Sequence, residues 1–125
     1  MNNKGNAVGW FEIYVEDMPR AKKFYESVFN RKLEKLESPD IEMWSFAGDM
    51  TSYGAPGALV KMPGFPVGQN SVLIYFSCAD CATEEKKVAE FGGKIKKNKF
   101  SIGHYGFIAL VTDTEGNMFG LHSLK

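Results

Sequence analysis

Residues 10–15 alternate between two kinds of side chain, which predicts a β-strand with two distinct faces. One face is uniformly apolar and carries Phe11, Ile13 and Val15. The other face mixes two aromatic rings with a carboxylate and carries Trp10, Glu12 and Tyr14. We expect the apolar face to pack against the protein core and the mixed face to point toward something else.

An amphipathic helix follows this strand. Its apolar residues recur at helical spacing and form one stripe, made by Ala21, Phe24, Tyr25, Val28 and Phe29. Asp17 is placed to cap the first turn, because its carboxylate can accept amide protons that have no partner inside the helix. Asn30 is a plausible left-handed residue at the end of the helix.

The second half of the chain repeats this arrangement. A predicted strand at residues 71–78 leads to Asp80, which corresponds to Asp17, and to a predicted helix at residues 83–91. This alignment places Tyr75 on Glu12 and Leu73 on Trp10. Three further strands follow each helix, at residues 32–36, 41–47 and 58–61 in the first half and at 94–100, 106–112 and 118–123 in the second.

The repeat predicts an α+β fold in one domain, residues 1–125, built from two βαβββ modules. The first module covers about 8–62 and the second about 71–124, joined by a linker rich in proline and glycine at about 63–70. Each half has four strands with a helix on one side. The opposite faces are therefore expected to form a cupped mixed sheet with the helices outside, and residues 48–57 and the linker are candidate lids.

Composition excludes several classes of function. Lysine plus arginine and aspartate plus glutamate each number 15, so the net charge of zero gives no reason to expect a nucleic-acid partner. The lysines at 94, 96, 97 and 99 are better explained as a solvated strand edge. No apolar run is long enough for a membrane span and the start of the chain lacks a signal peptide, so the expected location is cytoplasmic.

Three motifs give the chain a family resemblance: VEDMPRAKKFYESVF at 15–29, GGK at 92–94 and DTEGNMFGLH at 113–122. Together they resemble the vicinal oxygen chelate (VOC) superfamily, which contains glyoxalase I, extradiol dioxygenases and bleomycin-resistance proteins. The resemblance extends over nearly the whole chain. It is greatest to a glyoxalase-like branch related to lactoylglutathione lyase.

The resemblance also implies where a divalent metal would be bound. Members that chelate a metal use His or Glu at one position on the first and last strand of each half. Three of these positions fall on Trp10, Leu73 and Gly120, and the fourth lies on residues 58–61, which contain neither a carboxylate nor a histidine. Since none of these side chains is a metal ligand, we expect no cofactor, and a replacement metal site built from Glu12, Glu42 and His122 is disfavoured.

Glu12 and His122 are the predicted catalytic residues. A carboxylate on an aromatic-lined face can act in acid–base chemistry, and an imidazole can move protons. The structural alternatives are a strand carboxylate paired with a lysine or with water, and a histidine bonded to a backbone carbonyl. The predicted substrate pocket is lined by Trp10, Tyr14, Trp44, Tyr75 and His104, although such an aromatic stripe can equally be core or a dimer contact.

The sequence favours a protein that acts on or binds an unidentified small molecule. The alternative is a non-catalytic sequestering or resistance protein, as the resemblance to bleomycin-resistance proteins implies. A remote alternative is a thiol-disulfide protein that uses Cys78 and Cys81 at the start of the second helix. Metal-dependent glyoxalase I activity is not expected. The expected partners are a small-molecule ligand and a second copy of the chain in a homodimer, and neither nucleic acid nor membrane.

Overall fold

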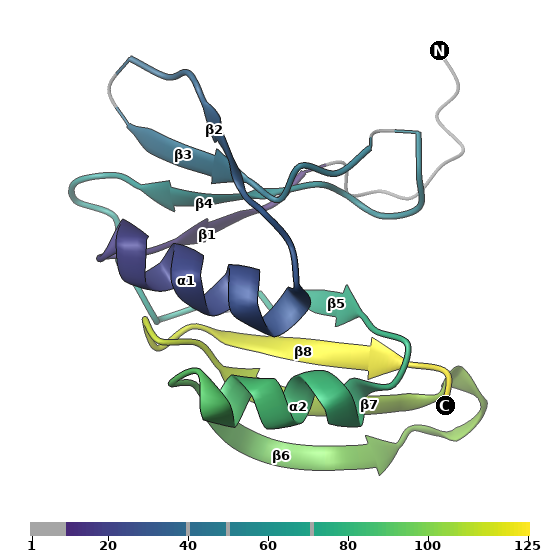
Figure 1. The fold of residues 1–125 in the computed structure, drawn as a ribbon. Helices are drawn as coiled ribbons and strands as arrows, with labels where there is room; N and C mark the ends of the chain where they lie inside the picture. Colours follow the sequence, from purple (N-terminus) through teal and green to yellow (C-terminus); the bar gives the residue numbers. More distant parts are fainter. Residues whose placement is uncertain (1–9, 40, 50, 71) are drawn as a thin grey trace.

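The structure is a computed structural model that describes residues 10–39, 41–49, 51–70 and 72–125 (Figure 1). The first half contains β1 (Glu12–Tyr14), α1 (Met18–Phe29), β2 (Glu34–Leu36), β3 (Glu42–Ser45) and β4 (Ala58–Lys61). The second half contains β5 (Tyr75–Ser77), α2 (Cys81–Glu90), β6 (Lys94–Ser101), the 3-10 turn η1 (Gly103–Tyr105), β7 (Phe107–Thr112) and β8 (Met118–Ser123).

Each half forms a four-stranded sheet with the same topology. The strand orders are β1-β4-β3-β2 and β5-β8-β7-β6, and the first strand of each module pairs in parallel with its last. Glu12 lies opposite Ala58, and Tyr75, the residue aligned with Glu12, lies opposite Gly120. The two βαβββ modules predicted from the repeat are therefore confirmed.

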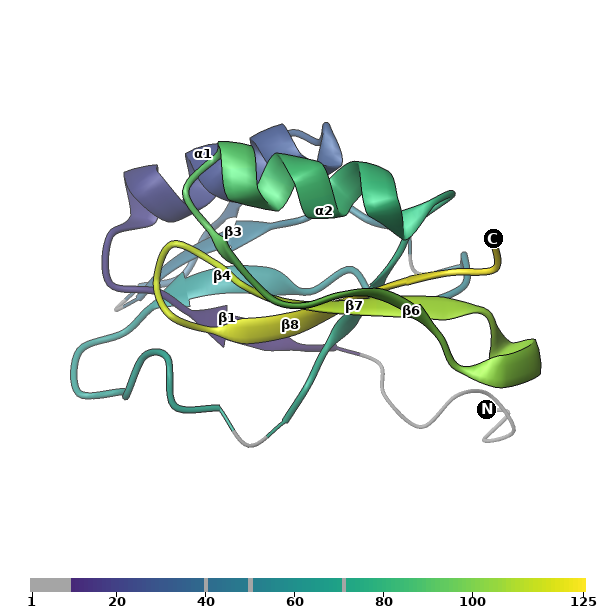
Figure 2. The ribbon, with the colours of Figure 1, turned by 90° about the horizontal axis from the view of Figure 1, so that it is seen from below.

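The two helices lie on the same side of the sheets, and the other faces stay open (Figure 2). Asp17 and Asp80 cap the helices as predicted, with carboxylates that accept from the amides of Arg20 and Ala82 at 3.0 Å. Asn30 ends α1 in the left-handed conformation, with φ 52°. Since Asp80 caps the turn directly after it, α2 begins at Cys81, two residues before the predicted start.

Aromatic rings fill the space between the helices and the sheets. The rings of Phe24 and Tyr25 on α1 contact Phe119 on β8 at centroid distances of 6.3 and 5.6 Å. Tyr25 also meets Phe46 from the first sheet and Phe76 from the second. The two modules therefore share one core, and this core fixes their positions relative to each other.

The turn between β7 and β8 connects the second module to the start of α1. The Tyr25 hydroxyl donates to Asp113 at 2.8 Å, and the side chain of Asn117 donates to the carbonyl of Tyr14 at 3.1 Å. The side chain of Asn117 also accepts from the amide of Gly68 at 2.9 Å, so this turn binds the linker as well. Burial raises the pKa of Asp113 even though four hydrogen bonds oppose the shift.

No helix in the described part of the chain is both long and apolar enough to cross a membrane.

Candidate functional site

A cavity of about 840 Å³ lies beside β5, the edge strand of the second sheet. Both modules line it: the residue before β1, the end of α1 and the loop after β3 come from the first, and β5, α2 and β8 from the second. Tyr75 and Phe76 both line it although their side chains point to opposite faces of β5. The cavity therefore reaches around the strand edge, from the helix layer to the open face of the sheet.

The floor of the cavity is aromatic. Phe29, the last residue of α1, stacks on Phe76 with the ring centroids 4.5 Å apart, and Phe46 lies 5.6 Å from Phe76. Phe11 adds a fourth ring, 5.9 Å from Phe46. The ring of Phe11 lies over Gly57, where φ is +65° and any side chain would overlap the ring. This glycine thus allows Phe11 to reach the floor.

The charged side chains that the first module gives to the cavity are engaged in local hydrogen bonds. Arg31 donates from Nη1 to the carbonyl of Phe46 at 3.1 Å. Asp49 accepts from the amide of Thr51 at 2.8 Å, from the hydroxyl of Thr51 and from that of Ser52. These bonds, that of the Thr51 amide foremost, lower the pKa of Asp49. Its carboxylate therefore shapes the loop after β3, and residues of this loop line the cavity.

Glu84 on α2 is the cavity residue with an unsatisfied acceptor. Its Oε1 is inaccessible to solvent and accepts no hydrogen bond from any residue that the structure describes. Its neighbour Cys78 points its sulfur at the carbonyl of Phe76, 3.6 Å away. An unpaired buried carboxylate oxygen costs about 1–3 kcal/mol or more, so Glu84 is held at this cost beside the cavity.

The same surroundings argue against thiol chemistry. Burial, and after it the charge of Glu84, raise the pKa of Cys78 to about 12. Cys81 is completely buried, and the two cysteines are not joined in a disulfide. A reactive thiol at a helix N-terminus needs a lowered pKa, which is the opposite of what Cys78 has.

His122 lines the cavity from β8, on the face of the sheet that also carries Tyr75. Its Nε2 lies 2.7 Å from the carbonyl of Tyr105. A carbonyl only accepts, so the bond requires a proton on Nε2 and leaves Nδ1 of the neutral ring as an acceptor. His122 therefore makes the bond to a backbone carbonyl that the structural alternative describes, and its catalytic role stays a prediction. His104 stacks on Tyr105 and is absent from the cavity wall.

Glu12 forms a separate cluster on the open face of the first sheet. It accepts from the indole of Trp10 at 3.2 Å and from the hydroxyl of Tyr14 at 2.7 Å. The hydrogen bond to Glu12 is the main cause that raises the pKa of Tyr14 to about 12. Phe65 from the linker packs on Tyr14 at 4.8 Å. Glu12 lines neither the cavity of His122 nor any other described hollow, so the two predicted catalytic residues are not brought together.

Trp44 lies on the opposite face from the one expected. Its β4 neighbour is Leu59, which in turn pairs with Ile13, and both are buried beneath the helices. The ammonium of Lys22 on α1 lies 3.3 Å from the centroid of the indole ring. Since residues opposite one another in a sheet share a face, Trp44 faces the helix layer and cannot join Trp10, Tyr14 and Tyr75 in one pocket.

The metal-ligand positions of the resemblance do not fit a metal. The pairing of Tyr75 with Gly120 corresponds to that of Glu12 with Ala58, so Ala58 is the fourth position, beside Trp10, Leu73 and Gly120. None of these side chains offers a donor atom. The ring of Tyr75 also covers Gly120 so closely that a Cβ there would overlap it. No group of three or more His, Cys, Asp or Glu side chains suited to a metal occurs among the described residues.

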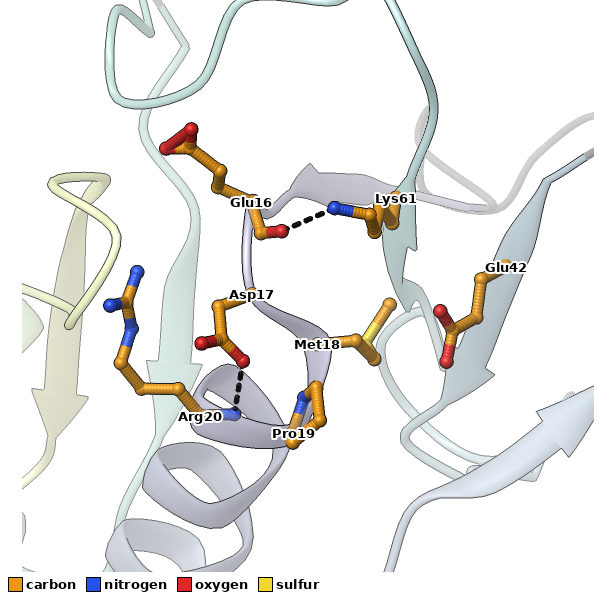
Figure 3. A pocket seen from close by; sticks show the side chains of 7 residues that line it. All are labelled: Glu16, Asp17, Met18, Pro19, Arg20, Glu42 and Lys61. Atoms are coloured by element: carbon orange, nitrogen blue, oxygen red, sulfur yellow. Dashed lines mark hydrogen bonds between the residues drawn. The ribbon is translucent and has the colours of Figure 1, made fainter.

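A second hollow of about 500 Å³ lies at the start of α1 (Figure 3). Glu16, Asp17 and Arg20 border it on one side and Glu42 on the other. Lys61 donates to the carbonyl of Glu16, so its ammonium is already engaged. Charged side chains line this hollow together with Met18 and Pro19, and no aromatic ring is among its described lining residues.

Comparison with known proteins identifies the family. A profile of the Glyoxalase/Bleomycin resistance protein/Dioxygenase superfamily matches residues 7–121. The chain belongs to this superfamily. A candidate glyoxylase, CFP32 from Mycobacterium tuberculosis, is 28% identical over 117 residues, which are 90% of this chain and 43% of the relative. This superfamily member thus spans less than half the length of that relative.

Solved structures of the superfamily share the fold. TnmS3, an antibiotic-binding protein from Streptomyces sp. CB03234, superimposes with a TM-score of 0.71 at 22% identity and covers 99% of this chain and 100% of its own. The V278E mutant of glyoxalase I from Zea mays gives 0.71 at 20% identity over 92% of this chain and 45% of that one. The VOC fold expected from the motifs is therefore confirmed.

Three polar residues of the cavity and of the contact between the modules were not predicted from the sequence. Arg31 follows the helix stop and reads as an ordinary surface cation. Glu84 reads as a first-turn acid that complements the positive end of α2. Glu115 reads as part of a family motif, although it binds Arg20 in the other module. A sequence signal existed for Glu84 alone, because its helical spacing places it on the same face of α2 as Cys81 and Val88, which are buried.

Proposed function

We propose that this superfamily member binds a small organic molecule in the cavity beside β5, without a metal at the four family positions. The observation that carries the proposal is the cavity itself. Its volume of about 840 Å³ and its aromatic floor are typical of ligand sites, which span roughly 300–1,000 Å³ and hold a few polar groups. Arg31, Glu84 and His122 supply those groups.

The family comparison supports binding as the primary role. TnmS3 is an antibiotic-binding protein and matches this chain over essentially the full length of both. In this proposal the protein sequesters its ligand, as a resistance protein would. It works as a homodimer in which exposed aromatic residues of the open faces, such as Trp10 and Tyr75, become covered.

The second candidate is an enzyme that transfers a proton on a carbonyl compound, and the observation that favours it is the state of His122. The carbonyl of Tyr105 fixes the proton on Nε2 and leaves Nδ1 able to accept one. Glu12 would take part only if the substrate lay on the open face of the first sheet. Neither candidate uses a metal at Trp10, Ala58, Leu73 and Gly120. Glyoxalase I activity is therefore not expected.

The experiment that tests the proposal combines metal analysis with a thermal-shift screen of small molecules. Protein purified without chelator should hold well below about one metal ion per chain, and ligands should raise its melting temperature. Ala79→Trp fills the cavity and should abolish these shifts, whereas Ala89→Trp, on the exposed side of α2, should keep them. Stoichiometric metal, or ligands that stabilise Ala79→Trp equally, would overturn the proposal.

Turnover separates the two candidates. An enzyme should lose turnover but keep ligand affinity in His122→Gln, because the amide cannot act as a base. A sequestering protein should show no turnover in the wild type, and affinity should fall when an aromatic floor residue is removed in Phe11→Ala.

A further inference from the structure

We infer that the ligand of this cavity is an organic cation, an aromatic molecule with a protonated amine that Glu84 binds. The inference rests on the proposed function, because it names the chemical class that the same cavity selects.

The charges around the cavity favour a cation. Three charged side chains line it, Arg31, Asp49 and Glu84, which gives one net negative charge. Arg31 is exposed and bonded to the carbonyl of Phe46, and Asp49 is occupied by the hydroxyls and amide of its own loop. Glu84 is left with an Oε1 that has no partner among the described residues, and the donor beside its carboxylate is the thiol of Cys78, which donates only weakly.

Burial of Glu84 is not explained by its place in the helix. An acid in the first turn interacts well with the helix dipole from a solvated position. Oε1 of Glu84 is instead shielded from water beside Cys78, whose thiol stays protonated at neutral pH. Glu84 lines the cavity, so an ammonium N–H of a ligand there can donate to its carboxylate, and charge-assisted hydrogen bonds are about twice as strong as neutral ones.

The rest of the wall suits the same ligand. The faces of aromatic rings attract cations, and Phe11, Phe29, Phe46 and Phe76 all line the cavity. Nδ1 of His122 adds an acceptor, since the proton of that ring is held by Tyr105. Aromatic faces, a carboxylate and a neutral acceptor together recognise a flat cation with N–H donors.

The test uses three fluorescent probes that share one ring system: 9-(aminomethyl)anthracene, 9-anthracenemethanol and 9-anthracenecarboxylate. At pH 7 they are a cation, a neutral molecule and an anion. We expect the amine to bind at least about 10-fold more tightly than the alcohol, and the carboxylate to bind more weakly than both. Glu84→Gln should weaken the amine about 10-fold and change the alcohol less than about 2-fold.

Glu90→Gln is the matched control, because it removes the same charge from an exposed position on the same helix. It should leave all three affinities unchanged. Equal binding of the three probes, or an amine affinity that Glu84→Gln leaves intact, would overturn the inference while the cavity remains a ligand site. Binding of none of the probes would overturn the inference, whereas the proposed function is decided by the Ala79→Trp comparison. Circular dichroism of each variant shows that the fold is kept.

Discussion

Glu115 is expected to hold the two modules together, and its replacement by glutamine gives a quantitative test. It lies in the turn before β8, and its Oε1 accepts from the amides of Glu16 and Asp17 at 3.2 and 3.1 Å. The guanidinium of Arg20 on α1 donates to both carboxylate oxygens, from Nε at 2.7 Å and from Nη2 at 2.9 Å. Glutamine keeps the size of the side chain, but it loses the charge and turns an N–H₂ group toward these donors.

The expected loss is about 1.5–2.5 kcal/mol at pH 7. Burial alone would raise the pKa of Glu115, but the bonds from Arg20, Asp17, Thr114 and Glu16 outweigh it and lower the pKa to about 2. A fall from the ordinary value of 4.5 would correspond to about 3 kcal/mol at full strength. Arg20 is 51% exposed, so solvent screens the pair and we reduce the figure accordingly.

The sign of the pH dependence follows from the lowered pKa. The ionised form is stabilised by folding, so the contribution is complete above the unfolded-state pKa of about 4.5 and disappears as the pH falls toward 2. Urea unfolding followed by tryptophan fluorescence should therefore show a wild-type advantage that is constant from pH 7 to about 5.5 and shrinks below pH 4.5. Glu90→Gln, exposed on α2, is the control and should change stability by less than about 0.5 kcal/mol. A Glu115→Gln loss as small as that of the control, or one unchanged at pH 2.5, would refute this account.

Two further predictions concern buried groups. Because burial and Glu84 raise the pKa of Cys78 to about 12, iodoacetamide at pH 8 should alkylate the native protein at least about 100-fold more slowly than the urea-unfolded chain. Rates within tenfold of each other would contradict the raised pKa. Tyr25→Phe removes a buried hydroxyl that donates to Asp113 and should cost about 1–3 kcal/mol in urea unfolding. Tyr14→Phe removes a hydroxyl at the open face and should cost less than about 1 kcal/mol, and the reverse order would show that burial does not set the cost.

Local chemistry made much of the fold predictable. The caps at Asp17 and Asp80 act within one helical turn, and the apolar stripe of α1 is fixed by helical geometry. The repeat then set the topology, because β1 and β5 begin at the aligned residues Glu12 and Tyr75. Each of these predictions depends on neighbours in sequence or on symmetry between the halves.

The candidate site was predicted less well because it depends on which face of each strand meets the helices. Alternation shows that Trp44 and Phe46 share a face, but it does not say which face that is. Phe46 is 4% exposed and lies in the core, so Trp44 also faces the helices. The acceptor at Glu84 required tertiary knowledge as well, since the shielding of its Oε1 depends on how the folded chain packs around it.

The close approach of Tyr75 to Gly120 can be tested by a pair of substitutions. The φ of this glycine is ordinary, so backbone strain does not require glycine there. What requires it is the ring of Tyr75, which a Cβ would overlap. Gly120→Ala should therefore cost about 1–3 kcal/mol, the usual cost of overpacking, and the cost should largely vanish in a Tyr75→Ala background. Urea unfolding of the four proteins in this double-mutant cycle measures the coupling. A coupling near zero would show that the ring of Tyr75 is not what requires glycine at position 120.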